Sequence, residues 1–93
     1  MKVSVEWDPA KARTNLKKHG VSFQEASSVF DDLLFITFLD MEHSLDEERY
    51  ITLGLSQRNR LLLVAHTDRE ETIRIISART ATRNERKFYE EAP

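Results

Sequence analysis

Short segments in which apolar residues alternate with polar ones recur along the chain, and this period of two is typical of β-strands. The clearest case is residues 49–56, where Ile51, Leu53 and Leu55 would share one side of a strand. Two segments are almost continuously apolar, which predicts strands covered on both faces. The pattern predicts five strands in all: residues 1–7, 33–39, 49–56, 61–67 and a segment that begins at Thr72.

A first helix is predicted directly after the first strand. Asp8 followed by Pro9 is a helix start, and the helix should end near His19, where Gly20 can adopt a left-handed backbone. Its apolar stripe is thin, and we expect it to consist of Ala10, Ala12 and Leu16.

Two capping boxes, each a Ser or Thr followed three residues later by Glu, predict two further helices. One box is Ser22 with Glu25, and the other is Thr82 with Glu85. The helix after Ser22 should end near residues 31–32 and place its apolar residues in the core: Phe23, Ala26, Val29 and Phe30.

The predicted order is one strand, two helices, four strands and a last helix. Short turns join the last four strands, including a hairpin at residues 57–60 where Asn59 tolerates a left-handed backbone. An acidic loop occupies residues 40–48. Neighbouring strands joined by short turns pair antiparallel. The expected fold class is therefore α+β, with an antiparallel sheet, two N-terminal helices and one C-terminal helix, in a single domain of residues 1–93.

Composition restricts the kind of site and the location of the chain. With no cysteine, disulfides and thiolate metal sites are excluded. No apolar run approaches the ~18 residues of a membrane span, and the N-terminus lacks a signal peptide, so we expect a cytoplasmic protein with no membrane contact. His19, His43 and His66 show no paired metal-ligand spacing, and two glycines cannot form a phosphate loop. We expect neither a metal nor a cofactor.

Charge is distributed unevenly along a chain whose net charge is −2. Residues 1–20 carry five basic and two acidic side chains. Residues 21–56 carry one basic and eight acidic side chains, and residues 57–87 carry eight basic and four acidic ones. A local basic surface can therefore bind a polyanion although the whole chain is slightly acidic.

Four arginines lie in or beside the junction between the last strand and the last helix: Arg74, Arg79, Arg83 and Arg86. One interpretation is structural, in which an ion pair between Arg79 and Glu85 fixes the helix to the sheet. The other is a guanidinium cluster that binds a phosphodiester.

The available side chains suit RNA cleavage without a metal, because the 2′-hydroxyl of RNA is its own nucleophile. A protein needs to remove a proton, stabilise charge on phosphorus and protonate the leaving oxygen. Arginines supply the charge stabilisation, His43 or His66 is a candidate proton shuttle, and Glu48 or Glu85 is a candidate base. His19, beside the helix end, is expected to be structural.

Three segments together resemble the BrnT family, the toxin halves of BrnT/BrnA type II toxin–antitoxin pairs: WDPAKARTNLKKHGVSFQEASSVF, HSLDEERYITLG and ISARTATRNERKFY. The resemblance covers nearly the whole chain, although Asn59 stands where we expect glycine in the hairpin. It implies a RelE-like fold, metal-independent ribonuclease activity that blocks translation, and neutralisation by a small BrnA-like antitoxin. It also implies a higher-order hetero-oligomer that contacts DNA only through the antitoxin.

The resemblance carries over to these polar positions: Lys18, His19, His43, Glu48, Arg49, Arg74, Arg79, Glu85 and Tyr89. We interpret three arginines as phosphate-binding and transition-state-stabilising groups: Arg49, Arg74 and Arg79. The other candidate catalytic residues are His43, His66, Glu48, Glu85 and Tyr89. The candidate RNA-binding residues are Lys17, Lys18, Arg69 and Arg83. The alternative function is a non-catalytic interaction domain that binds a partner helix through an apolar sheet face.

Overall fold

The structure, a computed structural model, describes residues 4–43 and 47–92. In chain order, the elements are β1 (Ser4–Trp7), α1 (Pro9–His19), α2 (Phe23–Ser27), the 3-10 helix η1 (Ser28–Asp31), β2 (Ile36–Leu39), β3 (Arg49–Leu55), β4 (Leu61–Arg69), β5 (Thr72–Thr80) and α3 (Arg83–Glu91). The predicted element order is confirmed. Residues 1–3 of the first predicted strand and 44–46 of the acidic loop lie outside the described residues.

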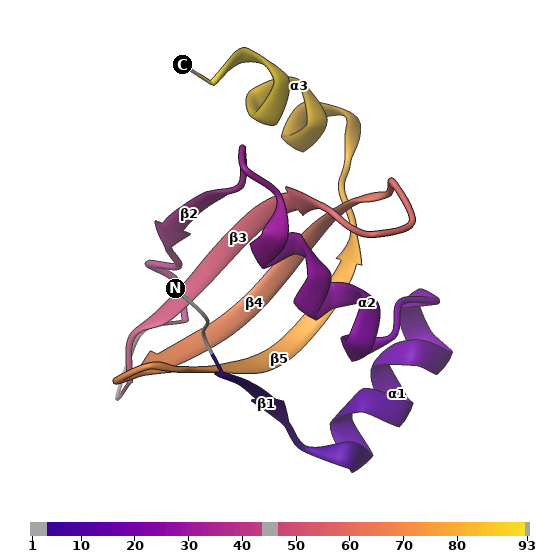
Figure 1. The fold of residues 1–93 in the computed structure, drawn as a ribbon, viewed down its shortest axis with the longest axis vertical. Helices are drawn as coiled ribbons and strands as arrows, with labels where there is room; N and C mark the ends of the chain where they lie inside the picture. Colours follow the sequence, from indigo (N-terminus) through magenta and orange to yellow (C-terminus); the bar gives the residue numbers. More distant parts are fainter. Residues whose placement is uncertain (1–3, 44–46, 93) are drawn as a thin grey trace.

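The strands form one sheet in the order β1-β5-β4-β3-β2, with α2 and η1 across one face and α1 and α3 at opposite ends of the molecule (Figure 1). The pairs from β2 to β5 are antiparallel, as predicted, and Asn59 has the predicted left-handed backbone, with φ of 61°. β1 departs from this pattern, because it pairs parallel with β5. No hairpin joins these two strands. β1 is held there by its apolar side chains, Val5 and Trp7, which pack on the core.

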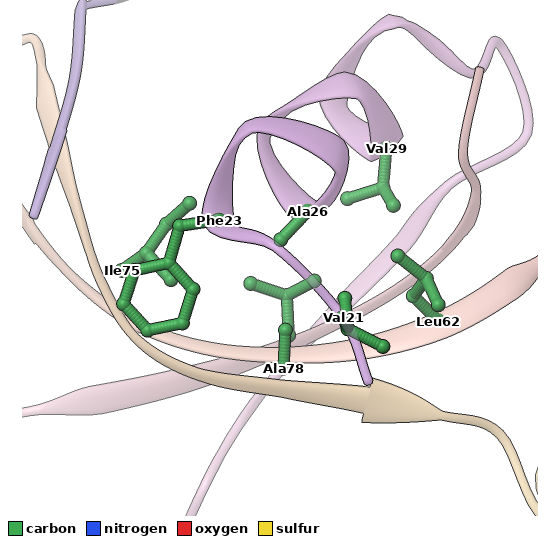
Figure 2. Packing of buried hydrophobic residues seen from close by; sticks show 8 residues of the cluster. Val21, Phe23, Ala26, Val29, Leu62, Ile75 and Ala78 are labelled. Atoms are coloured by element: carbon green, nitrogen blue, oxygen red, sulfur yellow. The ribbon is translucent and has the colours of Figure 1, made fainter. Parts of the chain in front are cut away.

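The core lies between α2, η1 and the sheet, as Figure 2 shows. Apolar residues at helical spacing on the helices meet the inward residues of β4, which alternate, and those of β5, where a shift in register spaces Ile75 and Ala78 three residues apart. The fully buried members of this cluster are Val21, Phe23, Ala26, Val29, Leu62, Val64, Ile75 and Ala78, with Phe30 partly buried against it. The prediction that the apolar residues of the second helix are core residues is confirmed.

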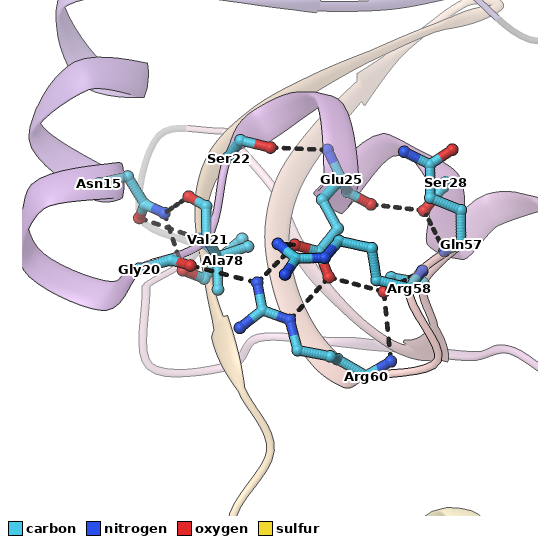
Figure 3. Close-up of polar contacts among 11 residues, drawn as sticks. Asn15, Gly20, Val21, Ser22, Glu25, Ser28, Gln57, Arg58, Arg60 and Ala78 are labelled. Atoms are coloured by element: carbon cyan, nitrogen blue, oxygen red, sulfur yellow. Dashed lines mark hydrogen bonds and ion pairs between the residues drawn. The ribbon is translucent and has the colours of Figure 1, made fainter.

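The first helix docks on the sheet through an amide rather than an apolar stripe. Asn15 is 5% exposed, and its side chain donates to the Val21 and Ala78 carbonyls, at 3.0 and 2.8 Å, and accepts from the Ala78 amide at 3.1 Å (Figure 3). Leu16 is 51% exposed and Ala10 is exposed, so the predicted stripe is wrong for both. The reason is that α1 faces the backbone at the edge of β5, whose polar groups need hydrogen bonds.

Glu25 lies in the first turn of α2 and ties this helix to the β3–β4 hairpin. Its amide donates to the Ser22 hydroxyl at 3.0 Å, as a capping box predicts. Its carboxylate turns into the protein, where it accepts from the Ser56 hydroxyl at 2.7 Å and from Arg60 Nε at 2.9 Å (Figure 3). The bond from Arg60 outweighs burial and lowers the pKa of Glu25.

The segment at residues 33–39 is a strand only from Ile36. The Asp32 carboxylate accepts hydrogen bonds from the amides of Leu34 and Leu55, at 3.0 and 2.9 Å, which holds the chain in a turn before β2. Leu33 and Leu34 are 98% and 72% exposed, so the prediction that this segment is covered on both faces is wrong. Across the described ranges no helix is long and apolar enough to cross a membrane.

Candidate active site

The strand register gathers several predicted residues on one face of the sheet. Ile75 and Ala78 point into the core under α2, so their neighbours Arg74 and Arg79 lie on the opposite face. His66 is buried on the α2 side, so the next residue of β4, Thr67, points to the opposite face. Arg49 pairs with Thr67 and therefore lies on that opposite face as well. We call it the arginine face, and its arginines are Arg49, Arg69, Arg74 and Arg79.

A continuous row of paired residues crosses four strands of this face. Glu6 on β1 is opposite Arg74 on β5, Arg74 is opposite Thr67 on β4, and Thr67 is opposite Arg49 on β3. Arg49 and Arg74 therefore flank a single residue, with backbones roughly 10 Å apart at the usual strand spacing. Two arginine side chains at this separation can reach one phosphodiester.

A groove of about 460 Å³ lies on the same face, lined by Glu6, Glu47, Thr67, Arg69, Glu70, Thr72 and Arg74. Its two arginines are each paired with a glutamate at the surface. Arg74 donates to Glu6 at 2.9 Å, and Arg69 donates to Glu47 at 3.1 Å. Such solvent-exposed pairs contribute little to stability, so an incoming phosphate can replace the carboxylates at small cost. We call this site the arginine groove.

His43 lies next to the row through the turn that follows β2. The Asp40 amide donates to the Arg49 carbonyl at 2.8 Å, and the Asp40 carboxylate lies 2.9 Å from His43 Nδ1. Because an ionised carboxylate only accepts hydrogen bonds, Nδ1 is the donor and Nε2 is left to exchange a proton. His43 is 59% exposed, and Glu48, directly before Arg49, is also exposed.

Arg79 lies farther along β5, roughly 15 Å from Arg74 at the usual strand rise. Its guanidinium donates to both oxygens of Glu85, at 2.8 and 2.9 Å, so the predicted ion pair is present. The hydrogen bond between them raises the pKa of Arg79 and lowers that of Glu85. Tyr89, on the same helix, donates to Asp32. Burial, followed by this bond to Asp32, raises the pKa of Tyr89 to about 12.

His66 lies on the α2 face and is 1% exposed. Its Nδ1 is 2.6 Å from Asp68, and its Nε2 is 2.7 Å from the Thr52 hydroxyl, which in turn bonds Thr37. The ring stacks on Tyr50, and burial lowers its pKa although Asp68 opposes this effect. Of the two candidate proton shuttles, His43 is therefore exposed to solvent, whereas His66 is buried.

The remaining predicted residues lie outside the arginine groove. Lys18 lines a second groove beside α1, together with Lys11 and His19, whereas Lys17 does not line it. Arg83 is exposed in the first turn of α3. Apart from the buried His66, the predicted site residues thus form two groups, one around Arg49 and Arg74 and one around Arg79, with the lysines beyond the sheet edge.

Sequence reasoning missed several residues that line the arginine groove: Glu6, Glu47, Thr67, Glu70 and Thr72. Alternation along β1 indicates that Glu6 faces away from Val5 and Trp7, but only the parallel pairing with β5 brings it to Arg74. Thr67 carries no sequence signal, because a threonine in a strand is common. Among the described residues, no three His, Asp or Glu side chains gather as a metal site.

Comparison with known proteins identifies the family. Residues 7–85 match the family model described as the ribonuclease toxin BrnT of type II toxin–antitoxin systems. The chain belongs to the BrnT family. It is also similar to the 1.1 Å crystal structure of the Brucella abortus ribonuclease toxin BrnT, with a TM-score of 0.67 and 21% identity over 88% of this chain and all of that one. None of the curated proteins matches the chain.

These findings fix the function class. BrnT membership makes the chain a ribonuclease toxin of a type II toxin–antitoxin system, as the resemblance in its sequence implied. The crystal structure supports the fold, and the predicted α+β class with its arrangement of helices is confirmed.

Proposed function

We propose that the chain is a metal-independent endoribonuclease that blocks translation in the cytoplasm and is neutralised by a BrnA-like antitoxin. The observation that carries the catalytic part is the row in which Arg49 and Arg74 flank Thr67 on the arginine face. Guanidinium groups bind phosphate oxygens bidentately and stay charged at every physiological pH, so two of them can hold a scissile phosphodiester without a metal ion.

In the proposed reaction the RNA 2′-oxygen attacks the adjacent phosphorus while the bond from phosphorus to the 5′-oxygen breaks. The products are a 2′,3′-cyclic phosphate and a new 5′-hydroxyl, so no water or cofactor is consumed. Arg74, released from Glu6, and Arg49 bind the non-bridging oxygens, whose negative charge grows in the transition state. Arg79 and Arg69 contribute positive charge to the same face.

The two proton transfers need groups that reach the substrate. His43 is our candidate for one of them, because it is exposed and is oriented by Asp40, whose amide donates to the Arg49 carbonyl. Glu48 is our candidate for the other. His66 is buried, and Glu85 and Tyr89 are engaged in bonds that hold α3, so we assign these three a supporting role.

The partner proposal follows from membership of a toxin–antitoxin family. The antitoxin would cover the chain, inhibit RNA cleavage and make any contact with DNA, in a higher-order hetero-oligomer. Lys17, Lys18 and Arg83 would contact RNA outside the catalytic centre.

The test is cleavage of single-stranded RNA by the purified chain in EDTA. We expect cleavage to persist, products to end in 2′,3′-cyclic phosphate, and substrates lacking 2′-hydroxyls to remain intact. Arg74→Ala should lower the rate by about 100-fold or more, as loss of a transition-state contact does. Arg13→Ala on the exposed side of α1 is the control with the same charge change. Loss of cleavage on chelation, restored by a divalent ion, would overturn the proposal.

A further inference from the structure

A second groove, of about 320 Å³, lies between α1 and the edge of β5. We call it the α1 groove. Six residues of α1 line it together with two residues of β5: Ala10, Lys11, Thr14, Asn15, Lys18, His19, Ile76 and Ser77. Its two lysines are Lys11 and Lys18. Neither the reaction nor the core described above uses this groove.

Helix geometry explains why these two lysines, among the basic residues of α1, line the groove. Lys11, Thr14, Asn15 and Lys18 are spaced at three, four and seven residues, so they share one face of the helix. Asn15 fixes that face against the sheet through its bonds to Ala78. Lys11 and Lys18 therefore flank the point where α1 docks, one helical turn to either side.

The groove exists because β1 is shorter than β5. β1 ends at Trp7, opposite Ile75, so the following residues of β5 face α1 instead of another strand. Ser77, which lines the groove, pairs with Ala65 and lies between Arg74 and Arg79 on the arginine face. The α1 groove consequently opens onto the arginine face at the edge of the sheet.

The charge of the α1 groove differs from that of the arginine groove. Three glutamates line the arginine groove, whereas none of the residues that line the α1 groove is acidic. Within residues 4–43 and 47–92, neither Lys11 nor Lys18 has an ion-pair partner. Lysine ammonium groups that are not neutralised attract the phosphates of a single-stranded nucleic acid, whose backbone follows a positively charged groove.

We propose that the α1 groove binds backbone phosphates of the RNA next to the segment held on the arginine face, through Lys11 and Lys18. This inference rests on the proposed function, since it extends the path of the same RNA. The apolar side chains of Ala10 and Ile76 contact the ribose or base between the two phosphates. The strand of RNA then passes from the arginine face over Ser77 and around the edge of β5.

The experiment compares two double variants for binding to a 2′-O-methyl RNA, which cannot be cleaved. Lys11→Ala with Lys18→Ala removes both groove cations. Arg13→Ala with Lys87→Ala removes the same charge from two exposed helical positions, one on α1 and one on α3, that lie outside the α1 groove. Fluorescence anisotropy at several salt concentrations gives the affinity and its salt dependence, and circular dichroism confirms that both variants are folded.

We expect the groove variant to bind roughly tenfold more weakly and to lower the salt slope by roughly 1.4, which corresponds to two single-strand phosphate contacts. The matched variant should weaken binding by about twofold at most, through the general field of the protein. Equal losses in both variants, or no loss in the groove variant, would overturn the inference. If the wild-type chain binds RNA with this dependence on the groove but never cleaves it, the proposed reaction fails and the binding site stands.

Discussion

The Arg79 guanidinium and the Glu85 carboxylate face each other in parallel, with both oxygens accepting hydrogen bonds. One of these oxygens also accepts from the Thr82 amide at 2.8 Å, which completes the capping box of α3. Glu85 therefore joins the end of β5 to the start of α3. An arginine of the arginine face is at the same time part of the joint that positions the last helix.

The two roles of Arg79 are separable by comparing Arg79→Ala with Glu85→Ala. Both variants lose the ion pair, which is partly exposed and contributes about 1 kcal/mol, so the thermal midpoint of Arg79→Ala should fall by about 4–8 °C. Glu85→Ala also loses the bond from the Thr82 amide, so its midpoint should fall further. Cleavage well below both midpoints should fall much further in Arg79→Ala, because Glu85→Ala leaves the guanidinium available for phosphate. Equal losses of cleavage in the two variants would show that Arg79 acts only through α3.

Local signals in the sequence were sufficient for elements whose bonds are made within a few residues. The Thr82 and Glu85 box, the helix start at Asp8 and the left-handed Asn59 need only neighbours in sequence, and all are present. At Glu25 the capping-box pattern predicted one of the two roles of the residue. The amide of Glu25 bonds Ser22 as predicted, but its carboxylate binds Arg60, 35 residues away, and no local pattern reveals that partner.

The grouping of the site residues could not be predicted, because it depends on strands that pair over long distances in the sequence. The alternation along β5 indicates that Arg74 faces away from Ile75, but its neighbours depend on β1 pairing 68 residues away in sequence. Asn15 resembles an ordinary surface residue of a basic helix until the open edge of β5 is known. The polar residues were therefore identifiable by type, whereas their grouping into two grooves required the sheet register.

Stability should depend strongly on Glu25. Its side chain is 3% exposed and accepts from Ser56 and Arg60, so Glu25→Ala leaves a hydroxyl and a guanidinium without their acceptor. We expect a loss of about 3 kcal/mol in the free energy of unfolding, measured in urea. Gln24→Ala, an exposed neighbour on the same helix, is the control and should cost less than about 0.5 kcal/mol. Similar losses for the two variants would contradict a structural role for the Glu25 cluster.

Acidification should destabilise the chain through His66. Burial lowers the pKa of His66 below its ordinary value of 6.5, so the folded state favours the neutral ring. The stability that this neutral ring contributes is complete above pH 6.5 and is lost as the pH falls below that value, because the unfolded state then binds the proton more readily. Protonation would also make Nε2 a donor, and the Thr52 hydroxyl would no longer have an acceptor there.

The measurement is the thermal midpoint between pH 7.5 and pH 5, compared with that of His66→Gln. The carboxylates with lowered pKa values, among them Glu25 and Glu85, titrate below this window and do not contribute to it. We expect the wild-type midpoint to fall with pH and the variant, although less stable at neutral pH, to show a flatter profile. Parallel profiles would assign the acid sensitivity to another group.

The antitoxin is expected to bind where apolar side chains remain exposed, around β2 and α3. Phe38 and Phe88 stack edge to face with ring centroids 6.1 Å apart, yet they are 40% and 55% exposed, and Leu34 is 72% exposed. β2 is also an edge strand of the sheet, and edge strands with apolar side chains are sites of strand addition. The adjoining segment 40–48 carries five acidic residues, so the surface suits an extended basic segment of the partner.

Calorimetric titration with the product of the neighbouring gene tests this surface. We expect nanomolar binding, a clearly negative heat-capacity change from apolar burial, a higher thermal midpoint and suppressed RNA cleavage. Leu34→Ser with Phe88→Ser should weaken binding by roughly 100-fold, since the two side chains would each lose about 1.5 kcal/mol of burial. Leu16→Ser, an exposed apolar position on α1, is the control and should leave the affinity within about threefold. Micromolar binding by the wild type, a heat-capacity change near zero, or cleavage that continues in the complex would each contradict the assignment, and a loss on Leu16→Ser would move the antitoxin site to α1.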